Sequence, residues 1–285
     1  MKEQFENKVM SSLLLYLDHK VSSKGDAYTN HSSNFYSTDH LYNGYYTYAA
    51  PFKQLVGDNS VTGATVWSGL YLNSTQVDIG TSGLHSVNHY EGQAYFSSQL
   101  AAGTAISGDY SIKDFNIYLT SKSEQELIFE TKFEVRPRVT QTVTGLAPNV
   151  QTYPAIFLKN NGGKNDPFAF GGLDSTILNV RCIVLADSAY SNDAVCGILK
   201  DLVRTNMPIV EKSELPFNAL GATTSTSGFN YSGITQNKTS GGDVAWVKDV
   251  TVSKNVGNFY KNDLNPNVFT SFVDFSLESI RLPRA

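Results

Sequence analysis

His85 and His89 are the two residues whose spacing most resembles a metal-binding motif. They stand four positions apart, and on a helix that spacing places two imidazoles on one face, as in H-E-x-x-H zinc sites. Gly83 and the β-type sequence around it argue against a helix here. On a strand the two residues share a face but lie about 13 Å apart, so that only a tight turn would let them hold one ion. We therefore predict no metal site.

The other motifs that mark enzymes are missing from the sequence. Gly162-Gly163-Lys164 lacks the G-x-x-x-x-G-K-[ST] frame of a phosphate loop, and neither a G-x-S-x-G elbow nor a catalytic Cys/His spacing occurs. Four glutamates fall on a predicted strand, where we expect a solvated or interfacial face: Glu124, Glu126, Glu130 and Glu134. We predict a protein that is not an enzyme, with no catalytic residues and no cofactor.

Charged residues are few for a chain of this size. Of 285 residues 41% are hydrophobic, which is enough for a sizeable core, but only 17% are charged, against about 25% in typical soluble domains. Neutral polar and aromatic side chains take the place of the missing charges. Such groups lose less free energy than Lys or Glu when a surface leaves water, so the composition favours extensive protein–protein contact. The alternative is a secreted or extracellular β domain, which has a similar composition.

The charge distribution, the cysteines and the apolar runs indicate which partners and which cellular environment to expect. The net charge is −4 and no dense basic run occurs, which argues against sequence-specific DNA binding but permits passive contact with DNA in a channel. Cys182 and Cys196 are expected to be two buried thiols. No apolar run approaches the roughly 18 residues of a membrane span, and the N-terminus does not resemble a signal peptide. We expect folding in a cytoplasm and no membrane contact.

Hydrophobic periodicity predicts a β-rich chain with two helices. Residues 4–22 carry a helical apolar stripe. Short β-type runs follow at Thr65–Leu72, Val87–Phe96 and Asp109–Leu119, and a longer one at Ser123–Arg136. Turn signals over residues 137–175 favour a boundary between two halves there. After it we predict a buried strand, a helix and two long strands: Thr176–Ala186, a helix over about 192–206, Asp243–Asn255 and Val268–Leu282.

These elements define the expected fold class and domains. The class is β-rich α+β, with antiparallel sandwich- or barrel-like sheets, an N-terminal helix and one helix packed on the C-terminal sheet. Residues 1–56 are expected to form the helix and a tyrosine-rich extended arm, residues 57–170 a β-rich domain, and residues 171–285 an α/β sandwich. Deleting residues 1–56 should leave a folded body that no longer assembles.

Several apolar and aromatic residues are candidates for contacts between subunits. Tyrosine offers large contact area, a polar tip and a small loss of side-chain entropy. The alternative for the segment 26–56 is a long irregular loop packed on its own core. The candidates come from the N-terminal helix, the tyrosine-rich segment and the Gly/Ser-rich loop 221–242: Leu13, Leu17, Tyr28, Tyr36, Tyr45, Tyr46, Tyr48, Phe229 and Tyr231.

Three segments resemble virion structural proteins of tailed bacteriophages: YTYAAPFKQLV (46–56), DFNIYLTSKSEQELIFET (114–131) and NVRCIVLADSAYSNDAVCGILKDLVRTNMPIV (179–210). The strand-then-helix unit at 176–206 is similar to the α/β sandwich of tail-terminator and neck proteins. The resemblance implies a ring of six or twelve copies around the DNA channel, with portal or connector and tail proteins as neighbours and with no catalytic residues. This chain has an additional β-rich first half.

Two functions are therefore expected from the sequence. The first is a ring-forming neck or head–tail component of a virion, which is assembled in the host cytoplasm. The alternative is a β-sandwich adhesin that binds a receptor or a carbohydrate, which the aromatic content and the Asn/Ser-rich loops favour.

Overall fold

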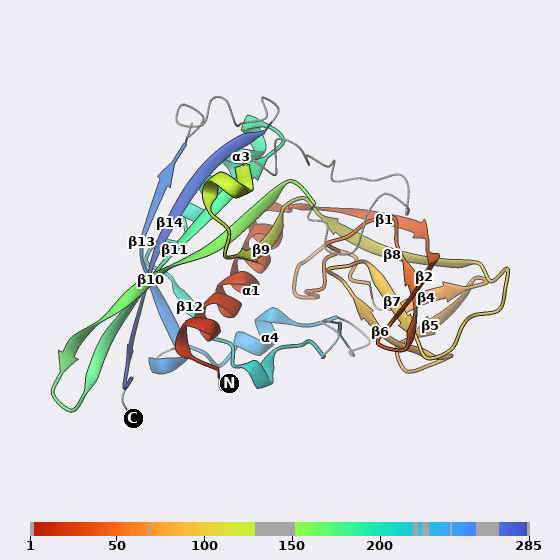
Figure 1. The fold of residues 1–285 in the computed structure, drawn as a ribbon, viewed down its shortest axis with the longest axis horizontal. Helices are drawn as coiled ribbons and strands as arrows, with labels where there is room; N and C mark the ends of the chain where they lie inside the picture. Colours follow the sequence, from red (N-terminus) through yellow and green to blue (C-terminus); the bar gives the residue numbers. More distant parts are fainter. Residues whose placement is uncertain are drawn as a thin grey trace.

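The computed structural model describes residues 3–67, 69–128, 152–218, 222–223, 228–239, 241–254 and 268–283. Within them the chain forms a sandwich of two four-stranded sheets beside a six-stranded sheet that helices cover (Figure 1). The predicted β-rich α+β class is confirmed, with an N-terminal helix and a second helix packed on the C-terminal sheet. No helix in the described parts of the chain has the length and apolar character needed to span a bilayer.

The sandwich has two antiparallel sheets, with strand orders β1-β8-β4-β5 and β2-β3-β7-β6. Apolar side chains from both inner faces meet in one core, in which Trp67, Leu70 and Phe96 are fully buried. Its strands are β1 (Tyr28–Asn34), β2 (Tyr36–Tyr42), β3 (Tyr45–Ala49), β4 (Gly69–Leu72), β5 (Thr75–Asp78), β6 (Leu84–Asn88), β7 (Gln93–Phe96) and β8 (Ile106–Lys113).

The six-stranded sheet has the order β12-β13-β14-β11-β10-β9. Its pairs are antiparallel except β9 with β10, which run parallel. The predicted strands at 176–186, 243–255 and 268–282 are confirmed with small shifts at their ends. The strands are β9 (Asn116–Thr120), β10 (Ala155–Ala169), β11 (Leu173–Ala186), β12 (Asn206–Pro208), β13 (Val244–Ser253) and β14 (Phe269–Arg281).

Two helices cover one face of this sheet. The apolar stripe of α1 (Phe5–Gly25) buries Val9, Leu13 and Leu17 against the sheet and α3. Asp26 ends the helix in the left-handed conformation. Helix α3 (Ala189–Lys200) begins after Ser188, whose hydroxyl accepts the backbone N–H of Ser191. The predicted start of this helix, near residue 192, lies about three positions too late, because Ser188 itself offers the short side-chain oxygen that an N-cap needs.

Backbone pairing divides the chain differently from the expected segments 1–56, 57–170 and 171–285. Helix α1 belongs to the core of the six-stranded sheet, whereas β1 to β3 belong to the sandwich. Strands β9 and β10 pair with the C-terminal sheet, so the expected boundary falls inside one hairpin. The predicted run Asp109–Leu119 is two strands, β8 and β9, in different sheets. Apolar and polar residues keep alternating through Asp114, so the sequence shows no break there. The chain nevertheless forms two strands, because β8 and β9 pair with strands of different sheets.

Strand β10 runs through residues that the sequence marks as turns. A bulge separates Asn160 from Gly163 in its pairing with β11, and Gly162 has a φ of +80°. Pro167 is tolerated because β9 pairs only with Ala155–Lys159, which leaves the rest of β10 as an edge. The turn residues therefore bend one long strand and do not separate two domains.

Two further strand predictions were wrong where the structure tests them. Residues 124–128 of the predicted strand Ser123–Arg136 are helical, and its remainder lies outside the described residues. The predicted run Val87–Phe96 is a hairpin of β6 and β7. Its turn contains Gly92, which has a φ of +64° that favours glycine.

Candidate subunit-contact surface

The end of β10 and the turn that joins it to β11 expose two phenylalanine rings. Phe170 is 106% exposed and Phe168 is 59% exposed. The turn closes through Gly171 and Gly172, whose φ values of +96° and +86° suit glycine. The hairpin projects beyond the rest of the six-stranded sheet at the lower left of Figure 1. Burying one such ring would stabilise a contact by about 1.5–3 kcal/mol, so among the described residues this hairpin tip (residues 168–172) is the strongest candidate for a contact with another molecule.

Sequence reasoning missed this tip. In the sequence, Asp166-Pro167 and Gly171-Gly172 indicate a domain boundary, and no contact role was predicted for the two phenylalanines between them. The available signal was their position, since two large apolar side chains enclosed by turn residues have no strand or helix face to bury them.

Five of the nine predicted contact residues are buried inside the chain, which corrects the prediction for them. Each is less than a tenth exposed, because α1, β3 and the segment around α4 (Tyr231–Thr235) pack on the protein's own sheets: Leu13, Leu17, Tyr48, Phe229 and Tyr231. The apolar stripe of α1 therefore stabilises this chain's own fold.

The other four predicted residues lie in the sandwich. The Tyr28 hydroxyl donates to the carbonyl of Thr62 at 2.8 Å, and the ring of Tyr45 lies 4.4 Å from that of His85. Tyr46 packs on the sandwich core, whereas Tyr36 is 49% exposed. The tyrosine-rich segment is thus three paired strands and no extended arm. Deleting residues 1–56 would remove parts of both cores.

The predicted Gly/Ser-rich arm at 221–242 is also anchored where the structure describes it. Phe229 forms a parallel bridge with Asp58, and Thr223 forms a bridge with Val87. Asn230 caps α4 by accepting the N–H of Gly233 at 2.7 Å. The described part of this loop therefore connects the six-stranded sheet to the sandwich.

Strand β2 presents a second apolar surface, at the edge of its sheet. Tyr36, Leu41 and Tyr42 are 49%, 58% and 48% exposed. An exposed edge strand with apolar side chains can accept a strand or a flat apolar surface from another molecule.

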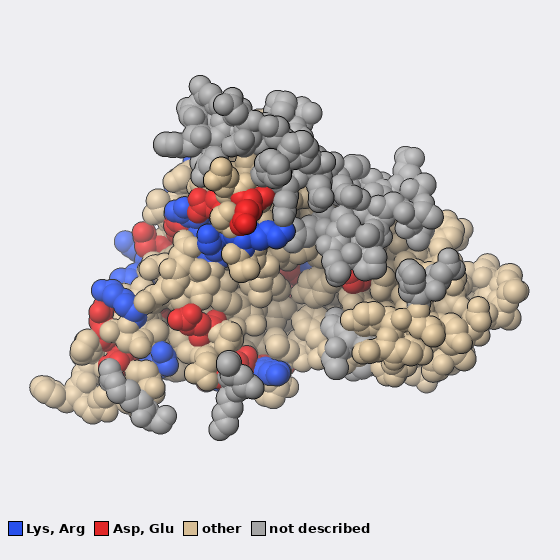
Figure 2. Space-filling model, in the orientation of Figure 1, with Lys and Arg blue, Asp and Glu red and all other residues tan. Residues whose placement is uncertain are grey.

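Charge is unevenly distributed over the surface. In Figure 2 the blue and red side chains gather over the six-stranded sheet and its helices, while the visible sandwich surface is largely neutral. On the sandwich, Lys53 is paired with Glu91 at 2.6 Å, and Lys113 at the end of β8 is paired with Asp18 of α1 at 2.8 Å. Another protein can therefore cover this largely neutral face while burying few charges.

A buried carboxylate links the two bodies. Asp58 accepts hydrogen bonds from Nδ1 of His19 at 2.7 Å, from the hydroxyl of Ser60 and from the N–H of Tyr231. Burial alone raises the pKa of Asp58, but these hydrogen bonds outweigh burial and leave its pKa below the usual value. The ionised carboxylate thus fixes α1 and α4 against the sandwich.

The two histidines considered as metal ligands do not converge. His89 is buried, and its Nε2 donates to the carbonyl of Trp67 at 2.8 Å. His85 contacts Ser86 and Tyr45 instead. Among the described residues no group of three or more His, Cys, Asp or Glu side chains is placed to hold a metal ion. Cys182 and Cys196 are both free and buried, as expected.

Comparisons with known proteins add no family to this description. No protein-family model matches the chain, and no curated protein matches it.

Proposed function

We propose that this protein is a structural component of a tailed-bacteriophage particle that forms a homo-oligomeric ring at the neck around the DNA channel. The observation that carries the proposal is the hairpin tip, where Phe168 and Phe170 extend into water. A tip that docks on a different surface of the next copy makes a head-to-tail contact, and such contacts close into rings when the rotation between copies allows it.

Two other features support assembly. The neutral sandwich surface in Figure 2 is suited to a large interface, and the low content of charged residues, 17%, agrees with this. Three segments loosely resemble phage virion proteins. This resemblance is the reason to propose a phage particle, with portal or connector and tail proteins as the expected neighbours. A ring of six or twelve copies is the expected form.

The mass of the purified protein in solution tests the proposal. The wild type should form a closed oligomer, and the double variant Phe168→Ser/Phe170→Ser should shift to smaller species. Tyr190→Ser is the matched control, because Tyr190 is 86% exposed on α3 and outside the tip. A wild type that stays monomeric at all concentrations contradicts assembly, whereas a double variant that keeps the full mass contradicts only the role of the tip.

The exposed residues of β2 favour a second candidate, a carbohydrate- or receptor-binding adhesin. Tyr36 and Tyr42 are about half exposed on one strand, and exposed aromatic rings can stack on sugars. Binding of the wild type to a glycan array, abolished by Tyr36→Ser/Tyr42→Ser, would favour this function over ring formation.

A further inference from the structure

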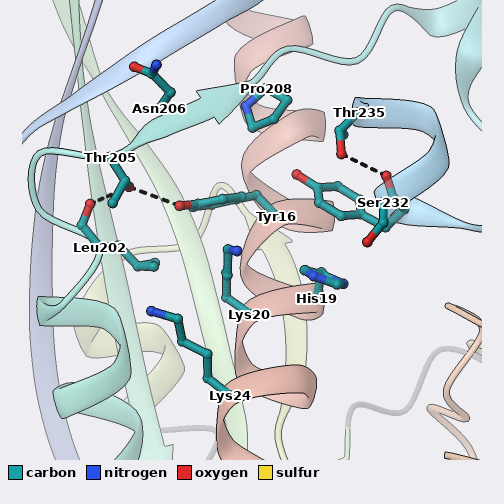
Figure 3. A pocket seen from close by; sticks show the side chains of 11 residues that line it. Tyr16, His19, Lys20, Lys24, Leu202, Thr205, Asn206, Pro208, Ser232 and Thr235 are labelled. Carbon is teal, nitrogen blue, oxygen red and sulfur yellow. Dashed lines mark hydrogen bonds between the residues drawn. The ribbon is translucent and has the colours of Figure 1, made fainter. Parts of the chain in front are cut away.

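A pocket of about 320 Å³ lies between α1, the segment from Leu202 to Pro208 and α4. Its size is within the range of small-molecule sites. The three walls come from distant parts of the chain, and Figure 3 shows that Lys20 and Lys24 extend from α1 into the space between them. None of the residues that line the pocket is acidic.

The helix wall presents two ammonium groups, of which that of Lys20 lies 5.5 Å from the centre of the Tyr16 ring. Lys20 and Lys24 are one turn apart on α1, and neither forms a salt bridge with any carboxylate that the structure describes. Like charges at this spacing repel each other and destabilise a helix. Burial and the neighbouring Lys24 lower the pKa of Lys20. An anion in the pocket would remove this repulsion.

The opposite wall supplies an unused hydrogen-bond donor. Tyr231 lines the pocket and is only 3% exposed, yet its hydroxyl is buried without a hydrogen-bond partner among the described residues. The ring is held in place by stacking on His19, with ring centres 4.7 Å apart. A buried hydroxyl without a partner is destabilising, so a ligand oxygen that accepts a hydrogen bond from it would be stabilised there.

Three hydroxyls around the pocket already donate hydrogen bonds within the protein. Thr205 donates to the carbonyl of Leu202 at 2.6 Å, so the Tyr16 hydroxyl donates to Thr205 Oγ1 at 3.0 Å (Figure 3). Thr235 donates to the carbonyl of Tyr231 at 2.9 Å. The donors that remain for a ligand among the described lining residues therefore include the two ammonium groups, the Tyr231 hydroxyl and the exposed side chains of Ser232 and Asn206.

We propose that this pocket binds a small molecule through a phosphate monoester group, with Lys20 and Lys24 neutralising the dianion and the Tyr231 hydroxyl donating to one of its oxygens. Two ammonium groups match the charge of a monoester phosphate, which approaches −2 at neutral pH, better than they match a carboxylate. The pocket has room for more than the phosphate itself, so the ligand can carry an organic part. The proposal is independent of ring formation.

Calorimetric titration of the full chain with phenyl phosphate, inorganic phosphate, acetate and a short DNA duplex tests the site. We expect saturable binding of phenyl phosphate with a dissociation constant of about 1 mM or lower, weaker binding of inorganic phosphate and none of acetate. Lys20→Met and Lys24→Gln should each weaken phenyl phosphate binding about tenfold. Lys24 is exposed, so its substitution does not endanger the fold.

Two further variants test whether the loss of binding is specific to the pocket or follows from a change in fold stability or net charge. Tyr231→Phe should weaken phenyl phosphate binding severalfold without lowering the melting temperature, because it removes a hydroxyl that has no partner. Lys159→Gln changes the net charge equally but lies on the far face of the sheet beside Arg181, and should leave binding unchanged. Absence of saturable binding, tighter binding of DNA than of phenyl phosphate, or an equal loss in Lys159→Gln would overturn the proposal.

Discussion

Lys113 Nζ lies 2.8 Å from the carboxylate of Asp18, and the two side chains are only 4% and 8% exposed. The pair joins the end of β8 in the sandwich to α1 on the six-stranded sheet. Lys113 also lies 5.0 Å from the centre of the Tyr90 ring. The two bodies are thus connected through a charge pair that water does not solvate.

Removing one member of this pair should destabilise the protein strongly. Asp18→Asn leaves the Lys113 ammonium buried without its counter-charge, and we expect a loss of about 3–5 kcal/mol in the free energy of unfolding. Urea denaturation measures it. The double variant Asp18→Asn/Lys113→Met should recover much of the loss. As a control, Lys164→Met breaks the exposed pair with Asp166 and should cost less than about 1 kcal/mol. A small effect of Asp18→Asn would show that water reaches the pair.

The stability of the protein should fall between pH 6.5 and 4 because of His89. Burial lowers the pKa of His89 from 6.5 to about 4, against the weaker opposite effect of its hydrogen bond to Trp67. The unfolded chain therefore binds a proton in this range that the folded protein excludes. Stability is fully present above pH 6.5 and decreases as the pH falls, by about 3 kcal/mol in total.

Urea denaturation at pH 7, 5.5 and 4.5 tests this dependence. His89→Gln should lower stability at pH 7 but show a flatter profile than the wild type. His85→Gln, at a position that is only partly buried, should keep the wild-type slope. Equal slopes in His89→Gln and the wild type would assign the acid sensitivity to other groups.

Two glycine-to-alanine substitutions should have opposite effects. At Gly92 the φ is +64° and a Cβ atom would lie 2.1 Å from the carbonyl oxygen of Phe52. Gly92→Ala should therefore destabilise the β6–β7 hairpin by about 2 kcal/mol or more. Gly197 in α3 has open space around the same atom, so Gly197→Ala should stabilise the protein by about 0.5–1 kcal/mol. Thermal melts distinguish the two, and a stable Gly92→Ala variant would contradict the close contact.

Leu13→Ala should act on folding and leave assembly contacts untouched. Leu13 is fully buried under the six-stranded sheet, so the cavity should cost about 2–5 kcal/mol. Tyr36→Ser, at a half-exposed edge position, should change stability by less than about 0.5 kcal/mol. If Leu13→Ala lowered only the mass of the oligomer, the residue would belong to a subunit interface after all.

The spacing of apolar residues predicted those helices and strands whose buried face is formed by residues close together in the sequence. The stripe through Val9, Leu13 and Leu17 predicted α1, and alternation predicted β13 and β14. These predictions were confirmed because a helix or strand with one apolar face must bury that face on something, whatever the partner is. The same pattern cannot name the partner. Leu13 and Tyr231 were expected to meet another subunit, and the tertiary structure buries both in their own chain.

Pairing between distant residues decided the rest. The division between β8 and β9, the continuation of β10 through Gly163 and Pro167, and the pocket formed by α1 and α4 depend on which strands and helices meet. The hydrogen bonds and the burial of these segments come from contacts between residues that are far apart in the sequence. Their contribution to stability outweighs the local preference of Gly and Pro for turns. For the same reason the exposure of Phe170 and the unused hydroxyl of Tyr231 became visible only in the folded protein.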